Sequence, residues 1–338
     1  MLIDILGIEQ GLQAAGIECT PRHDDIMLLG RKDLLRVFLR SDGEVQRISV
    51  LPGEQAQKHW TLRKGKQNSF PRVPLRDKTK QGGERDRAPL RPNGNAELLK
   101  LLADRKRPLP ARFDAFRKLC DSTPLKLERF QPWPGGRSQI ELWARRIGAF
   151  ATPSIKVLFD VFAMPSGGTK LLEKIDARIR EELGETPDQS LFELARNLLF
   201  HEGGAVLLDA WVDGDPKPAC HPDHIALLTR ALEGDASLPA ETGVCALSGV
   251  VGPLQTGALS PAKLPVMGET TLFAKYPGYV DSGKRERVPN CVFRYGRAWS
   301  EGFPINADLA ARLRVSAEEI AGPAREGKTW SKLGQSFT

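Results

Sequence analysis

The side chains best suited to chemistry lie in residues 58–118, where basic residues are concentrated. This stretch holds 18 Lys and Arg against 6 Asp and Glu, whereas the whole chain of 338 residues holds 49 against 42. The residues outside the stretch are therefore acidic on balance. A regional excess of cations is typical of a surface that contacts phosphate. We expect residues 58–118 to contact nucleic acid.

Arg63–Ser69 combines cations with amide side chains and is the best candidate for reading a sequence. Amides can donate and accept hydrogen bonds at base edges, so the candidate base readers are Gln67 and Asn68. The candidate phosphate contacts are basic residues in or just after this run. They are Lys64, Lys66, Arg72, Arg76, Lys78 and Lys80.

A solvated surface is the plainer interpretation of any charge run, and it stays open for this one. The stretch also contains aromatic residues, which can stack on bases or pack in a core. These aromatic residues are Trp60, Phe70, Phe113 and Phe116.

Metal sites are not predicted, because each apparent motif lacks ligands. His201-Glu202 resembles half of a zinc-protease motif, but Ala205 stands where the second His is needed. Two Cys–His pairs four residues apart, Cys19/His23 and Cys220/His224, have no second thiol at zinc spacing. A polar turn and a helix start explain these residues without a metal.

Catalytic and cofactor sites are not predicted either. Ser166–Lys170 precedes a helical pattern and resembles a phosphate cradle, but the earlier Gly of that motif is absent. Capping of a helix by Ser or Thr explains it better. No Ser/His/Asp set is recognisable. We therefore expect a protein that is not an enzyme and uses no cofactor.

Composition indicates a soluble protein of the cytoplasm. The N-terminus has no basic segment followed by an apolar one, and no apolar run approaches the roughly 18 residues needed to span a bilayer. The five cysteines are scattered, which does not indicate a disulfide framework.

The elements that must position the basic stretch come first in the chain. Apolar spacing predicts a helix over 3–16 that ends at Gly16. Two extended segments, 33–40 and 44–51, flank Asp42-Gly43, which predicts a β-hairpin. Residues 71–95 are rich in Pro, Gly and charge, so a long basic loop is expected. Helical patterns follow at 97–104, 113–119 and 138–147.

The second half of the chain alternates between the two kinds of element. We predict strands at 155–163, 205–212 and 244–249, and helices at 169–183, 222–232 and 308–319. The fold class is therefore α+β. An N-terminal domain, 1–150, has a helix plus a β-hairpin with the long basic loop and contacts nucleic acid. A second, mixed α/β domain, 151–338, acts as a scaffold and ends in a short polar tail.

Two regions together resemble the large subunit of the subtype I-C CRISPR Cascade complex. The first is the helix and hairpin of Val37–Val45 followed by the basic run Arg63–Pro74. The second is Val206–Asp213, a helix, and Cys245-Ala246-Leu247-Ser248-Gly249. The positions that resemble later family motifs are Ser260–Val266, Arg294-Tyr295-Gly296 and Asn306.

The resemblance is loose over about two thirds of the chain and has two departures. Arg76–Asn95 replaces an aromatic- and Asn-rich family stretch, and the C-terminal helical bundle of the family is missing. The resemblance therefore indicates a minimal variant, or one that receives these helices from another protein.

The resemblance implies a non-catalytic subunit that recognises the protospacer-adjacent motif in duplex target DNA and helps R-loop formation. Its partners would be crRNA, the Cascade backbone subunits, the subunit that binds the crRNA 5′ end, and a recruited helicase-nuclease. The alternatives are a stand-alone nucleic-acid-binding protein and a metal-dependent hydrolase or nuclease.

Overall fold

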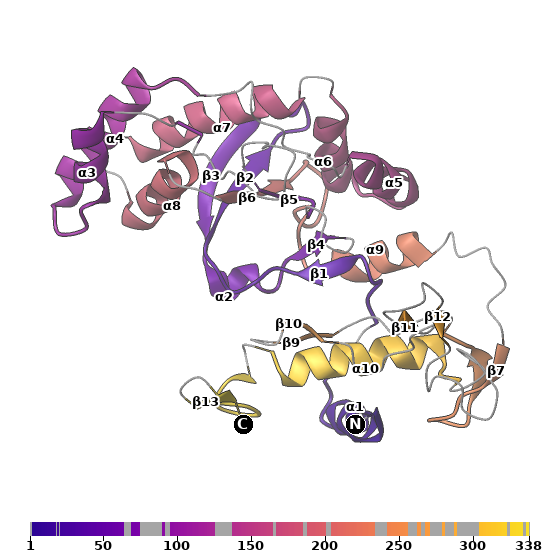
Figure 1. Ribbon diagram of the computed structural model, residues 1–338. Coiled ribbons are helices and arrows are strands. Elements are labelled where there is room, and N and C mark those ends of the chain that lie inside the picture. The colour runs from indigo at the N-terminus through magenta and orange to yellow at the C-terminus, as the bar shows by residue number, and fades with distance from the viewer. Residues whose placement is uncertain are drawn as a thin grey trace. The chain divides into compact units, whose positions relative to one another are not determined.

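The structure is a computed structural model, and it describes most of the chain. The described residues are 2–17, 19, 21–63, 69–74, 90–91, 95–125, 137–164, 167–184, 188–200, 204–233, 242–255, 262–264, 268–270, 279–280, 287–288, 304–322, 325–333 and 336–337. The class is α+β, as the sequence predicts (Figure 1).

The chain forms two compact units that differ from the division expected at residue 150. The first unit combines Met1–Asp24 with Glu233–Thr338, and the second is Asp25–Leu232. The expected boundary falls inside the second unit. The physical reason is strand pairing, because a strand near residue 207 completes a sheet that the early hairpin begins.

A four-stranded sheet forms the centre of the second unit, in the order β3-β2-β6-β5. Its strands are β2 (Leu34–Leu39), β3 (Val45–Leu51), β5 (Arg72–Pro74) and β6 (Ala205–Ala210). The predicted hairpin is confirmed, since β2 pairs with β3 in antiparallel register. Gly43, in the turn, has φ +77°, a backbone conformation that favours glycine. β6 pairs parallel with β2 and antiparallel with β5.

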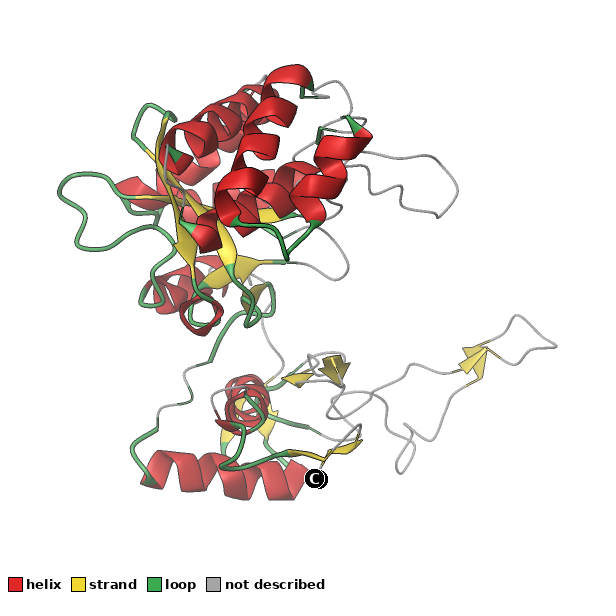
Figure 2. Ribbon diagram, turned by 90° about the vertical axis from the view of Figure 1, so that its left-hand side faces the viewer, coloured by secondary structure: helices red, strands yellow, loops and turns green. Residues whose placement is uncertain are grey.

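One face of this sheet supports the core. Side chains alternate along a strand, so Leu35, Val37 and Leu39 point to the same face, and all three are buried. Their register partners on β6 are Val206, Leu208 and Ala210, which are also buried. Three helices that contact the sheet cover this face: α6 (Pro153–Ala163), α7 (Gly167–Leu183) and α8 (Gln189–Phe200), with α7 packed against the other two. Figure 2 shows most helices of the unit on one side of the strands.

The other elements of the second unit surround this core. A two-stranded sheet pairs β1 (Ile26–Leu28) with β4 (Trp60–Leu62). The remaining helices are α2 (Gly53–Ala56), α3 (Ala96–Ala103), α4 (Leu109–Ser122), α5 (Arg137–Gly148) and α9 (His224–Glu233). Helices were predicted at the positions of α3, α4, α5, α7 and α9, and all five are confirmed. α8 was not predicted, although Asp188, which accepts a hydrogen bond from Leu191 N, precedes a helical apolar pattern.

The strand predicted at 155–163 is wrong, because this segment is helix α6. Pro153 occupies the first turn, and the Thr152 hydroxyl accepts a hydrogen bond from Ile155 N at 3.4 Å. This start is typical of a helix. The run is apolar almost throughout because α6 is buried on most sides, leaving only Lys156 and Asp160 exposed between Ser154 and Phe162. A continuous apolar run does not distinguish a buried helix from a buried strand.

The first unit is built on α1 (Leu2–Ala14) packed against α10 (Ala307–Ile320), both of which were predicted. Gly16 follows α1 with φ +72°, as expected of a residue that ends a helix. Ile5, Leu309 and Leu313 are buried in a separate apolar cluster. Arg312 Nε lies 3.1 Å from Glu9 Oε1, which links the two helices.

The remaining strands of the first unit form short antiparallel pairs. They are β7 (Thr242–Val244) with β8 (Val251–Pro253), β9 (Ala262–Leu264) with β10 (Gly268–Thr270), β11 (Tyr279–Val280) with β12 (Arg287–Val288), and β13 (Lys332–Leu333) with β14 (Ser336–Phe337). Within the described ranges, no helix has the length and apolar character needed to cross a membrane.

Candidate nucleic-acid interface

Among the eight predicted contact residues, Arg72 is the one that the structure describes. It lies on the edge strand β5 and is half-buried. The other seven fall outside the described residues, in 64–68 and 75–89. They are Lys64, Lys66, Gln67, Asn68, Arg76, Lys78 and Lys80.

The flanks of residues 64–68 are held together. Leu62 and Phe70 form an antiparallel bridge, with Phe70 N 2.9 Å from Leu62 O. Arg63 N donates to Asp25 O at 2.7 Å, and the Ser69 hydroxyl donates to Arg72 O at 3.1 Å. The residues on both sides of the run that holds Gln67 and Asn68 are therefore fixed by hydrogen bonds close to one another. The C-terminal side continues directly into β5.

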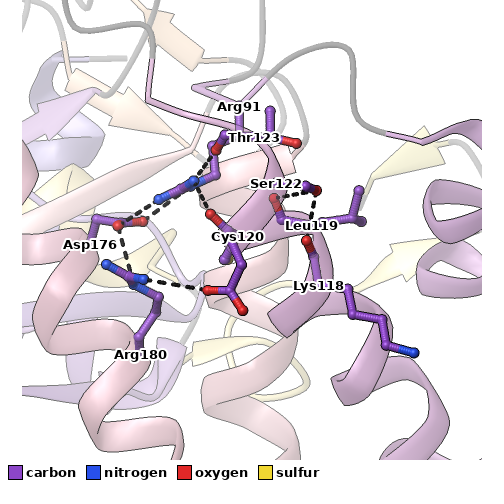
Figure 3. A network of polar contacts seen from close by, with 9 residues as sticks. Arg91, Lys118, Leu119, Cys120, Ser122, Thr123, Asp176 and Arg180 are labelled. Carbon is purple, nitrogen blue, oxygen red and sulfur yellow. Dashed lines mark hydrogen bonds and ion pairs between the residues drawn. The ribbon is translucent and has the colours of Figure 1, made fainter.

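The second basic segment, residues 75–89, follows β5 in the sequence. The next two residues, Leu90 and Arg91, are both buried. Arg91 N donates to Leu199 O at 2.9 Å. The Arg91 guanidinium is buried and donates to the Asp176 carboxylate of α7 through Nε at 3.3 Å and Nη2 at 2.7 Å. Its Nη1 donates to Cys120 O at 2.7 Å and also to Thr123 O, at the end of α4 (Figure 3). Arg91 is thus a structural cation within the basic stretch.

The α3–α4 helical hairpin carries a cluster of exposed cations. Six exposed cations lie there against four exposed carboxylates, Glu97, Asp104, Asp114 and Asp121. The cations are Lys100, Arg105, Lys106, Arg107, Arg117 and Lys118. Three of them are consecutive in the turn between the helices, where Asp104 Oδ1 accepts from Lys106 N at 3.0 Å. Such a surface can contact phosphates without reading sequence.

Arg112 fixes the base of this hairpin. It is buried, and its Nε donates to Leu102 O, a carbonyl in the last turn of α3, at 3.2 Å. Its Nη2 lies 2.6 Å from Glu193 Oε1 on α8. The Arg112 and Arg196 guanidiniums lower the pKa of Glu193 against the opposing effect of burial. Glu193 therefore stays ionised and paired with Arg112 at neutral pH. This ion pair attaches the turn with its three cations to the core.

The aromatic residues of the basic stretch pack in the core. Trp60 and Phe70 have no exposed area, and Phe113 and Phe116 are 4% and 1% exposed. Phe116 contacts the ring of Phe192 with centroids 5.7 Å apart. Stacking of these four rings on bases is therefore excluded in this conformation.

A buried polar network crosses the strands at the centre of the sheet. Asp209 on β6 has no exposed area, and Arg36 on β2 donates to its Oδ2 through Nε at 2.7 Å. Asp209 Oδ1 accepts from Cys220 N at 2.9 Å. Burial lowers the pKa of nearby His59, and the Arg36 guanidinium lowers it further. Burial also disfavours the charged form of the Cys220 thiol and so raises its pKa.

Cys220, His224 and Cys245 each form hydrogen bonds within the fold. Cys220 Sγ donates to Leu208 O at 3.1 Å, and His224 Nδ1 hydrogen-bonds to Ala219 O at 2.9 Å. In the first unit, Asn306 N donates to Cys245 Sγ at 3.4 Å. Burial raises the pKa of the Cys245 thiol, but hydrogen bonds from Asn306, Ser248 and Leu247 together bring it below its usual value. In the part of the chain that the structure describes, no three His, Cys, Asp or Glu side chains are arranged to hold a metal ion.

The polar networks were missed at the sequence level, although one cue was present. Arg36 stands in an otherwise apolar strand, and Asp209 interrupts an apolar run in the same way. Buried charges are usually paired, so a charge in each of two predicted core strands could have suggested a contact. Residues 201–203 of the His-Glu motif lie outside the described ranges, and so does Ser166 of the supposed phosphate cradle. Gly167–Lys170 are the first residues of α7.

Comparison with known families and proteins gives no relative for this chain. No protein-family model matches it, and no curated protein matches it significantly.

Proposed function

We propose that this protein is the non-catalytic large subunit of a crRNA-guided, Cascade-like surveillance complex in the cytoplasm. In this role it recognises the protospacer-adjacent motif in duplex DNA and helps R-loop formation. Pairing with the guide reads most of the target, while protein side chains read the short motif and the shape of the duplex. Its partners are crRNA, the backbone subunits, the subunit at the crRNA 5′ end, and a recruited helicase-nuclease.

One observation carries the proposal: the basic run Arg63–Pro74 ends in β5, a strand of the sheet to which both regions of family resemblance contribute. The hairpin of the first region supplies Val37–Leu39 of β2, and Val206–Asp213 of the second supplies most of β6, its direct neighbour. β5, the end of the basic run, pairs with the other side of β6. Regions distant in sequence that carry one resemblance thus share a sheet, which supports treating them as parts of one family pattern.

A second contact supports the same assignment in the first unit. Cys245 and Asn306, both part of the resemblance, are 61 residues apart in sequence and meet through the Asn306 N–H and the Cys245 sulfur. Gly252 approaches Asn306 so closely that an added Cβ would lie 2.3 Å from its Nδ2. The motif residues therefore have a packing reason to occur together.

The roles of the residues follow from their chemistry. Gln67 and Asn68 read base edges, and Lys64, Lys66, Arg72, Arg76, Lys78 and Lys80 contact phosphates. The α3–α4 hairpin adds sequence-independent phosphate contacts through its exposed cations. Metal or catalytic groups have no part in this role.

Co-expression tests the assignment to a complex. The tagged chain is expressed with a crRNA-bearing Cascade backbone that lacks its large subunit, and the purified material is analysed for RNA and subunit stoichiometry. The proposal expects the chain to co-purify with the crRNA-bearing complex. Elution as a monomer that binds nucleic acid alone would instead support a stand-alone binding protein. Specific nicking of plasmid DNA would support a nuclease.

Two variants separate base reading from phosphate contact. Asn68→Ala is expected to weaken discrimination among flanking motifs, because it removes the base-reading amide. Lys64→Ala is expected to weaken binding to all duplexes alike and to lower the salt dependence. Identical motif profiles for wild type and Asn68→Ala, measured over a series of duplexes, would remove Asn68 from the base-reading role.

A further inference from the structure

The sheet of the second unit has a second face, opposite the one that α6, α7 and α8 cover, and its central residue Leu207 is buried. Arg36 and Phe38 alternate with the buried core residues of β2, so they point to this second face. Cross-strand partners point to the same side. Ser49 and Arg47 of β3, which pair with Arg36 and Phe38, therefore also belong to the second face.

The same register places Arg72 on the second face. Arg72 pairs with Leu207, and Leu207 pairs with Arg36. Neighbouring strands are about 4.8 Å apart, so the backbones at Arg72 and Arg36 are separated by about 10 Å. A predicted phosphate contact thus shares a face with two arginines that were not singled out in the sequence.

Two of these arginines lie over one aromatic ring. The guanidinium carbon of Arg36 is 4.5 Å from the centroid of Phe38, and that of Arg47 is 4.4 Å from it. Phe38 is only 4% exposed although it lies on the second face. Arg36 is itself fixed by the fully buried Asp209. A chain of contacts therefore runs from the sheet interior through Arg36 and Phe38 to Arg47.

Arg47 is the exposed end of this chain of contacts. Its side chain is exposed, and no carboxylate among the described residues forms an ion pair with it. Asp209, an acidic side chain of this face, is already engaged by Arg36. Stacking of a guanidinium on a ring leaves its in-plane N–H groups available, in a geometry that matches two phosphate oxygens. A side chain held in this way also loses less freedom on binding.

We propose that Arg47, stacked on Phe38, is a preorganised contact for a backbone phosphate of bound nucleic acid, on the second face of the sheet and the same side as Arg72. This inference rests on the proposed function, because it requires that the protein bind nucleic acid. It adds a contact outside the basic stretch 58–118.

Salt dependence of binding tests the contact. The full chain is titrated with a short fluorescein-labelled DNA duplex, and anisotropy gives the binding constant between about 50 and 200 mM salt. Arg47→Gln is expected to make the negative slope of log K against log salt shallower by about one. It should also weaken binding to every duplex alike. Arg178→Gln is the matched control. It removes the same charge from α7, on the opposite side of the sheet, where Arg178 is paired with Glu181 and Glu182.

Phe38→Leu provides a second readout, because it keeps an apolar side chain but removes the ring under Arg47. It is expected to weaken binding less than Arg47→Gln and to leave the salt slope nearly unchanged, since the charge remains. If Arg47→Gln binds with the wild-type slope, the Arg47 contact is refuted while the proposed function stands. If the wild-type chain, alone and within the co-purified complex, binds no nucleic acid, both are refuted.

Discussion

Arg91 and Asp176 form a buried ion pair that fixes the chain at the end of the basic segment 75–89, and its removal should be costly. The side chains are 5% and 3% exposed. Arg91→Met keeps much of the side-chain volume but removes the donors to the Asp176 carboxylate and to Cys120 O and Thr123 O. The variant leaves a buried carboxylate with a weaker set of partners.

The magnitude follows from burial and from the one cation that remains. Removing one partner of a buried ion pair costs about 3–5 kcal/mol. Arg180 Nε lies 3.4 Å from Asp176 Oδ2 and keeps part of the compensation, so the lower end, about 3 kcal/mol, is expected. For a domain of this size, each kcal/mol shifts Tm by about 2–4 °C. Arg91→Met should therefore lower Tm by about 6–12 °C.

Thermal unfolding followed by circular dichroism at neutral pH measures this shift. Arg31→Met is the control, because it breaks the exposed pair of Arg31 with Glu54, 2.7 Å apart, and should cost less than about 1 kcal/mol. A double variant, Arg91→Met with Asp176→Leu, should recover most of the loss because no unpaired buried charge remains. The reasoning is refuted if Arg91→Met and Arg31→Met lower Tm equally.

Three further outcomes follow from single positions. Gly43→Ala should destabilise the protein by more than about 1 kcal/mol in urea unfolding, because φ at Gly43 is +77° and an added Cβ would lie 3.0 Å from Val161 Cγ2. A urea midpoint equal to that of the wild type would contradict this. Burial raises the pKa of the Cys120 thiol to about 12, so it should resist alkylation at pH 9 in the folded protein and react on unfolding, which mass spectrometry of the labelled peptide would show. Burial lowers the pKa of His59, so the unfolded chain takes up this proton at a higher pH than the folded one. The free energy of unfolding should therefore decrease as the pH falls through about 6.5, and His59→Asn should show a smaller decrease between pH 7 and 5; an equal decrease would assign the effect to other groups.

Local signals in the sequence were sufficient for elements whose pattern has one meaning. The Asp42-Gly43 turn between alternating segments predicted the hairpin, because the φ above zero at Gly43 is a local requirement. Periodic apolar spacing predicted α1 and α10 in the same way. The apolar run at 155–163 was ambiguous, and its helix was decided by burial on several sides.

For the candidate site, the sequence by itself determined where the cations are, and therefore that residues 58–118 are suited to phosphate. It could not determine which cations face solvent. Arg91 and Arg112 belong to the same run as exposed Arg105, yet both are buried and paired with carboxylates from α7 and α8. Composition fixes the number of charges, but only tertiary packing decides which are neutralised by partners distant in sequence. Packing likewise placed Arg36, Phe38 and Arg47 in contact, because strand register brings distant side chains onto one face.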